Sequence, residues 1–130
     1  MSKYTREEIL QHRAEWVAAL RSGKYPQTKG RLRAPEGYCC LGVATELAGC
    51  KGAWCELDGA YCYGDFDAGM PPEAQEWLGV SDILPDSGRY GDNYASLNDA
   101  GASFEEIADH FEEYGFHPSI DVLAQEEETE

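Results

Sequence analysis

The same helix-start signal stands near each end of the chain, and this pair of signals most constrains the fold. Each is a capping box, in which a Ser or Thr and a Glu three residues later bond each other's backbone N–H groups: Thr5 with Glu8, and Ser103 with Glu106. Apolar residues follow at helical spacing until Gly23 ends the first run and Gly115 the second. The sequence therefore predicts amphipathic helices over residues 6–22 and from Ser103 to Gly115.

The middle of the chain predicts shorter elements. A brief strand is predicted around Arg31–Arg33, and a helix over Cys40–Leu47 that ends at Gly49. A hairpin is predicted over residues 53–67 with its turn at Asp58–Gly59, and a short helix from Pro71–Pro72 to Gly79. Residues 80–96 are predicted to form a long loop. We expect an α+β fold, in which the two amphipathic helices pack with a central helix and a small antiparallel sheet.

Length and composition favour one globular domain. The chain has 130 residues, of which 42% are hydrophobic and 12% aromatic, enough to bury a core without disulfides or a metal. We expect this domain to span residues 1–122. Residues 123–130 are acidic and poor in apolar groups, so a disordered tail is expected there.

Targeting and cysteine signals point to the cell interior. No apolar run approaches the roughly 20 residues of a membrane-spanning helix, and the N-terminus lacks the apolar core of a secretory signal. The five cysteines are an odd number, which fits free thiols in a reducing cytosol better than a disulfide framework. We expect a soluble intracellular protein without membrane contact.

Charge is distributed very unevenly. The net charge is -15, but residues 1–33 hold eight basic against three acidic residues, which gives +5 there and -20 in the remainder. An acidic remainder repels phosphate backbones, so general nucleic-acid binding is disfavoured. An anionic ligand would have to be bound by the basic segment.

The basic segment supplies the predicted binding residues Lys29, Arg31 and Arg33, followed by Tyr38. Alternating Arg31 and Arg33 would project the same way from a strand, a geometry suited to phosphate or carboxylate. The alternative is that these cations only pair with the abundant surface carboxylates. Other tyrosines near glycine-rich segments could line a pocket or cap the core: Tyr61, Tyr63, Tyr90 and Tyr94.

Asn98 and Asp99 are the second part of the predicted site. An Asn-Asp pair can bind a ribose or a base edge. The pair also precedes Gly101 and the second capping box, so it could instead form the turn that orients the last helix.

Adjacent Cys39 and Cys40 stand at the start of the central predicted helix, where a thiol can be activated as a nucleophile. His110 or His117 would then be the base of a papain-like thiol hydrolase. Zinc is a weaker interpretation, because Cys50, Cys55 and Cys62 add thiols without any CxxC or paired His spacing. We favour structural burial, and assign no catalytic residue, metal ligand or cofactor.

Four stretches carry a resemblance to a known group: WVAALRSGKYPQTKGRLR, GYCCLGVATEL, PPEAQEWLG and LNDAGASFEEIAD. Over roughly residues 16–114 the chain resembles a family of short uncharacterised accessory proteins encoded by bacteriophages and prophages. The resemblance implies expression in the cytoplasm of an infected bacterial host. It supplies no catalytic residues.

Three functions follow in order of preference. The first is binding or sequestration of a small anionic, nucleotide-type host ligand, as a protein that counteracts host defence signalling and that could be a homo-oligomer. The second is an acidic inhibitor that mimics nucleic acid toward a host protein, which the net charge of -15 favours. The third is the thiol hydrolase.

Overall fold

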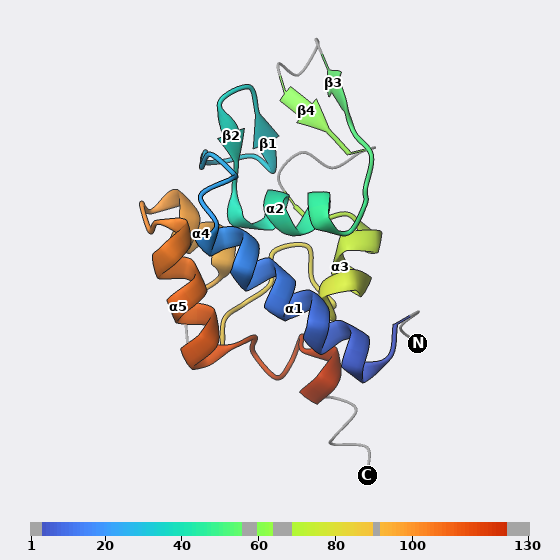
Figure 1. Cartoon of the computed structure of the whole chain (residues 1–130). Coiled ribbons are helices and arrows are strands. Elements are labelled where there is room, and N and C mark those ends of the chain that lie inside the picture. Colours follow the sequence, from blue (N-terminus) through green and yellow to red (C-terminus); the bar gives the residue numbers. More distant parts are fainter. Residues whose placement is uncertain (1–3, 56–59, 64–68, 90–91, 125–130) are drawn as a thin grey trace.

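The computed structural model describes residues 4–55, 60–63, 69–89 and 92–124, and Figure 1 shows their arrangement. The elements are α1 (Arg6–Arg21), β1 (Arg33–Ala34), β2 (Gly37–Tyr38), α2 (Cys40–Leu47), β3 (Ala53–Cys55), β4 (Ala60–Cys62), α3 (Pro72–Leu78), α4 (Tyr94–Asp99) and α5 (Phe104–Tyr114). The predicted α+β class in one small domain is confirmed.

The two terminal helices form where the capping boxes predict them. In α1 the Glu8 N–H donates to Thr5 Oγ1 at 3.2 Å, and in α5 the Glu106 N–H donates to Ser103 Oγ at 3.1 Å. The two helices pack against each other across the core. The buried face of α1 is the predicted one: Ile9, Arg13, Trp16, Val17 and Leu20.

Helix α2 lies at the centre and is buried over its first six residues. It contacts α1, α3 and α4. The indole Nε1 of Trp16 donates to the carbonyl of Cys40 at 2.9 Å, and its ring packs edge-on against Tyr94 and Phe111. These aromatic contacts join both terminal helices to the centre of the molecule.

The end of α3 is held by a buried arginine. Gly79 ends the helix in the left-handed region (φ 78°), as predicted, which exposes the last carbonyls. Arg13 donates to the carbonyl oxygens of Leu78 at 2.9 Å and Gly79 at 3.0 Å. Its guanidinium also pairs with Asp121 at 2.8 Å. A cation on α1 therefore stabilises both the end of α3 and the C-terminal segment.

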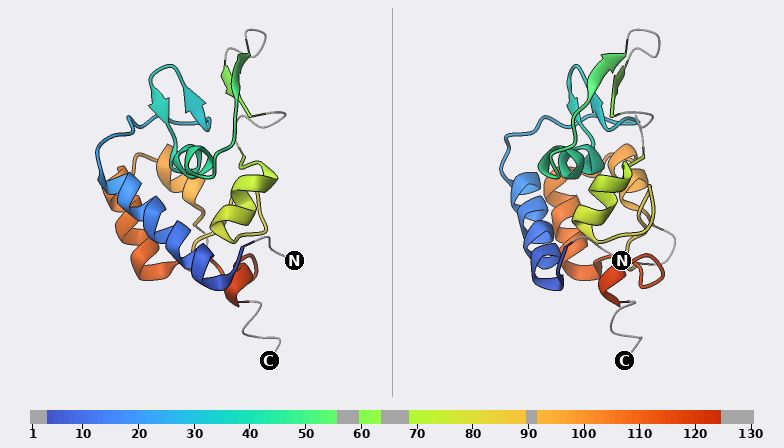
Figure 2. Two further views of the ribbon diagram at one scale, coloured as in Figure 1. Left: turned by 45° about the vertical axis from the view of Figure 1, so that its right-hand side comes forward. Right: turned by 90° about the vertical axis from the view of Figure 1, so that its right-hand side faces the viewer.

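The predicted antiparallel strands are present, and they form two separate two-stranded hairpins. β1 pairs with β2 and β3 pairs with β4, both antiparallel. Both hairpins stand at the same end of the helices, and β1 contacts β4 without pairing with it (Figure 2). The predicted turn at Asp58–Gly59 lies outside the described residues.

One helix was missed. Tyr94–Asp99 forms α4, within the segments predicted as a long loop and as a turn at Asn98–Asp99. The side chain of Asn93 caps α4 by accepting from the Ser96 N–H at 2.8 Å. Six residues span fewer than two turns, too few for a helical periodicity to show in the sequence.

The C-terminal segment packs against the helices as far as Leu123. That side chain is buried, and its N–H donates to Asp121 Oδ1 at 3.0 Å. Residues 125–130, most of the expected acidic tail, lie outside the described residues. In the described part of the chain, no helix is both long and apolar enough to cross a membrane.

Candidate functional site

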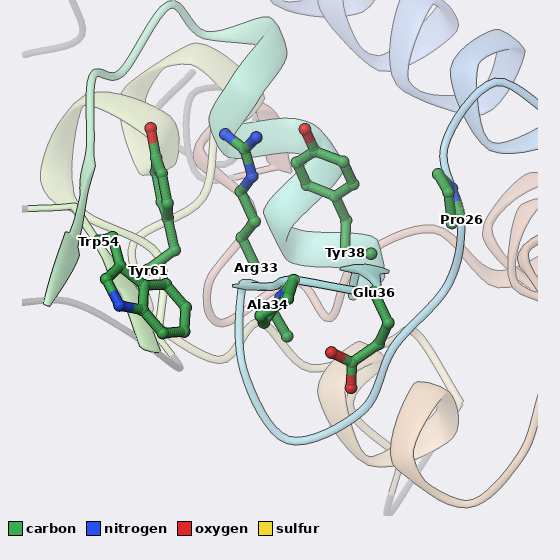
Figure 3. Close-up of a pocket in the computed structure, with 9 residues that line it drawn as sticks. Pro26, Arg33, Ala34, Glu36, Tyr38, Trp54 and Tyr61 are labelled. Carbon is green, nitrogen blue, oxygen red and sulfur yellow. The ribbon is translucent and has the colours of Figure 1, made fainter. Parts of the chain in front are cut away.

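A cavity of about 420 Å³ opens between the two hairpins and is shown in Figure 3. We call it the hairpin hollow. Its lining combines aromatic rings, prolines and two opposite charges: Pro26, Arg33, Ala34, Pro35, Glu36, Gly37, Tyr38, Trp54 and Tyr61.

Backbone contacts fix one wall of the hollow. The Tyr38 N–H donates to the Pro26 carbonyl at 2.8 Å, and the Thr28 N–H donates to the Tyr38 carbonyl at 2.7 Å. A Cβ at Gly37 would lie 2.3 Å from the Pro26 oxygen, so only glycine allows this close approach. The segment before β1 is therefore held against β2.

Arg33 lies between two tyrosine rings (Figure 3). Its Cζ atom is 4.2 Å from the ring centroid of Tyr61 and 5.0 Å from that of Tyr38. Arg33 Nη1 is 3.6 Å from Glu46 Oε2, and Glu46 also accepts a hydrogen bond from Tyr63. The Arg33 side chain remains one-third exposed. The guanidinium is thus held in position while part of it faces solvent.

Trp54 lines the hollow from the β3–β4 hairpin. It is directly across from Tyr61 in the β3–β4 hairpin, and 48% of it is exposed. A large ring left half in water offers a flat face on which a planar ligand can stack. Sequence reasoning did not single out Trp54. The available signal was a tryptophan within the predicted hairpin.

Glu36 places a negative charge in the lining of the hollow. It lies in the turn between β1 and β2 and is exposed. Figure 3 shows its carboxylate and the Arg33 guanidinium pointing in opposite directions from the hairpin. The hollow is therefore lined by one positive charge, one negative charge and aromatic rings.

The structure separates the two arginines that were predicted to act together. β1 begins at Arg33, so Arg31 precedes the strand and the two side chains do not alternate along it. Arg33 and Tyr38 line the hairpin hollow. Arg31 and Asp99 line a second hollow of about 190 Å³, together with Gly30, Cys39, Leu84, Asn93, Ala95 and Ser96. Lys29 is exposed and lines neither.

Asn98 holds the basic segment to the core. Its side chain is fully buried, and Oδ1 accepts from the Cys40 N–H at 3.2 Å while Nδ2 donates to the Thr28 carbonyl at 2.8 Å. Gln27 Nε2 donates to the same Oδ1 at 2.8 Å. Both ends of the amide are used inside the protein, so we leave Asn98 out of the proposed binding site. Asp99 accepts from the Gly30 N–H at 2.8 Å.

The other tyrosines considered at the sequence level have different positions. Tyr61 lines the hollow, and Tyr63 is buried behind it with its hydroxyl on Glu46. Tyr94 lies in the aromatic core against Trp16. Tyr90 lies outside the described residues.

The adjacent cysteines are buried. Cys39 caps α2 by accepting from the Gly42 N–H at 3.4 Å, and burial raises the pKa of its thiol to about 11. Cys40 is fully buried, donates to the Tyr94 carbonyl at 3.3 Å, and also has its pKa raised by burial. Almost all of each thiol is therefore protonated at neutral pH, which favours the structural interpretation over a nucleophile.

The candidate bases have other contacts. His110 packs against the rings of Tyr94 and Tyr114, and His117 Nδ1 is 2.8 Å from Ser119 Oγ in its own turn. Within the part of the chain that the structure describes, no three His, Cys, Asp or Glu side chains gather closely enough to hold a metal ion.

A family model described as a domain of unknown function (DUF8296) matches residues 9–115 of the chain. The match covers both hairpins, both hollows and the helices from α1 to α5, apart from the first three residues of α1. Because it spans most of the sequence, the chain belongs to this family. No curated protein and no solved structure matches the chain significantly.

Proposed function

We propose that this DUF8296 protein binds a small, planar, anionic ligand of the nucleotide type in the hairpin hollow. One observation carries the proposal: the Arg33 guanidinium is held between Tyr38 and Tyr61, in a cavity that the half-exposed Trp54 also lines. An anionic group would take the exposed side of the guanidinium. A ring would stack on Trp54.

The two contacts supply energies of known size. Hydrogen bonds to a charged group contribute about 1.5–3 kcal/mol, and stacking of a base on an aromatic side chain about 1–3 kcal/mol. Glu46 already balances part of the Arg33 charge, so the anion contact belongs at the lower end of its range. We therefore expect modest affinity, and a titration should extend to millimolar ligand.

The biological setting in this proposal is the one implied by the sequence resemblance, a bacterial cell infected by a phage. There the protein would sequester a nucleotide-type signal of the host. Mass spectrometry of small molecules released from protein purified out of infected cells would identify the ligand. Recovery of a protein partner, and of no small molecule, would instead favour the acidic inhibitor.

The acidic inhibitor receives less support from the exposed face of α5. Arg21 binds three carboxylates of that face, with Nη1 at 2.8 Å from Glu105 and 2.9 Å from Asp109, and a further bond to Glu112. A surface that mimics nucleic acid depends on a strong negative potential. Here one arginine partly neutralises it.

Tryptophan fluorescence tests the proposal directly. Trp16 and Trp77 are buried, so a ligand in the hollow should change the emission of Trp54. We expect saturable quenching by mononucleotides, no such change in Trp54→Phe, and calorimetric affinity at least about tenfold weaker in Trp54→Ala.

Arginine variants provide the matched control. Arg33→Gln should weaken nucleotide binding about tenfold, whereas Arg31→Gln makes the same chemical change beside the other hollow and should leave it unchanged. Unchanged binding in both Arg33→Gln and Trp54→Ala would disprove the proposal. Loss of binding in Arg31→Gln alone would move the site to the second hollow.

A further inference from the structure

We infer that the hairpin hollow selects guanine among the bases through Glu36, an inference that rests on the proposed function. Two opposite charges, Arg33 and Glu36, line the hollow, and their charged groups point away from each other (Figure 3). A phosphate accounts for the arginine. A carboxylate in the same cavity repels phosphate, so the other end of the ligand must present hydrogen-bond donors.

The chemistry of the bases then decides which one fits. A carboxylate is acceptor-only and has two oxygens, so it best matches two adjacent N–H donors. The Watson–Crick edge of guanine presents the N1–H and the 2-amino group side by side. In adenine and cytosine the amino group stands next to a ring nitrogen acceptor, and in uracil the single N–H lies between two carbonyls. Each of those edges brings an acceptor toward the carboxylate.

Glu36 is well placed for this role. It lies in the two-residue turn of a hairpin whose strand register is fixed by the pairs Arg33 with Tyr38 and Ala34 with Gly37. Thr28 Oγ1 donates to its Oε2 at a long 3.4 Å. In the described part of the chain Glu36 is exposed and has no ion pair, so no neighbouring cation balances its charge.

The aromatic lining supports the same assignment. Stacking on Trp54 is tolerant of the base and cannot distinguish guanine from adenine. Discrimination must therefore come from a polar group at the edge of the ring, and a site built to bond a donor rejects an analogue that lacks it. Glu36 is the carboxylate that lines this cavity in the described residues.

Calorimetric titration of the full chain with GMP, IMP and AMP, at an ionic strength of about 0.15 M, tests the inference. GMP should bind at least about tenfold more tightly than AMP. IMP keeps the N1–H but lacks the 2-amino group, so its affinity should lie between the two.

Substitution of the carboxylate completes the test. Glu36→Gln should reduce GMP affinity to that of AMP and leave AMP binding unchanged, while Glu76→Gln, an exposed change outside the hollow, should preserve the preference. Equal affinities for all three nucleotides, with Trp54 still required, would refute guanine selection and leave the proposed function intact. If no nucleotide binds at millimolar concentration, both are wrong.

Discussion

Arg13 and Arg33 have similar surroundings in two regions of the molecule, with opposite consequences. Arg13 lies in the helical region, formed by α1 to α5, above the ring of Phe116 and paired with Asp121. Arg33 lies in the hairpin region, formed by residues 26–38, 53–55 and 60–63, against two tyrosine rings and Glu46. Each has an aromatic contact and a carboxylate partner.

Burial separates the two arginines. The Arg13 side chain is 10% exposed and donates to two main-chain carbonyls besides its carboxylate, so its bonding capacity is directed inward. The Arg33 side chain is 33% exposed, has a looser ion pair and lines a cavity. The same residue type is therefore a structural element in the helical region and a candidate ligand contact in the hairpin region.

The largest expected effect is the loss of Arg13. Arg13→Ala leaves the carboxylate of Asp121 partly buried without its partner, and removes the donors for two carbonyls at the end of α3. Breaking a buried ion pair in this way costs about 3–5 kcal/mol. Urea denaturation followed by circular dichroism would measure the change in the free energy of unfolding.

A double variant isolates the ion pair. If the Asp121 carboxylate is the main group left without a partner in Arg13→Ala, the double variant Arg13→Ala/Asp121→Ala should lose less unfolding free energy than the two single variants added together. A loss below about 1 kcal/mol in Arg13→Ala would show that the buried arginine behaves like a surface one.

The next effect concerns the link between the two regions. Asn98→Ala should cost about 2–3 kcal/mol, because the Cys40 N–H and the Thr28 carbonyl lose their buried partner. It should also release the basic segment, so that trypsin cleaves faster at Lys29. Asp99→Ala removes an exposed acceptor and should have little effect on stability, although the loss of its bond to the Gly30 N–H also loosens the chain next to Lys29. Equal losses of stability in both variants would contradict the assigned role of Asn98.

How far the sequence predicts these regions depends on the kind of signal each contains. The terminal helices were predicted closely, because capping boxes and an apolar face act within one segment. The hollow was predicted only in part. Arg33 and Tyr38 are adjacent through the hairpin, but Trp54 and Tyr61 reach the hollow only because a second hairpin packs beside the first.

Asn98 is a residue whose role the local sequence could not predict. Its polarity suggested a surface contact or a turn, and neither describes a fully buried amide in α4 with bonds to a distant segment. Those partners lie about 60–70 positions away in sequence, so no local pattern identifies them. Tertiary packing decides whether such a residue faces a ligand or the core.

A smaller effect is expected from the pH dependence of the helical region. Burial lowers the pKa of His110 from its ordinary value of 6.5, and its buried Nε2 atom has no hydrogen-bond partner among the described residues. The unfolded chain then binds more protons than the folded one, so stability should fall as pH decreases below about 6.5. Denaturation midpoints of His110→Phe should fall less than those of the wild type between about pH 6.5 and 5.

The last expected effect, and the one that most sharpens the comparison, belongs to Arg33. Arg33→Gln removes a partly exposed ion pair with a 3.6 Å separation, worth about 0–1 kcal/mol, and the contacts of the guanidinium with two tyrosine rings, worth about 0.5–1 kcal/mol each. The same variant should lose about tenfold in nucleotide affinity, because the hollow loses its positive charge. Measuring unfolding and binding on one preparation separates the two roles. If unfolding of Arg33→Gln is as severely affected as that of Arg13→Ala, Arg33 is a structural arginine as well, and the distinction between the two regions fails.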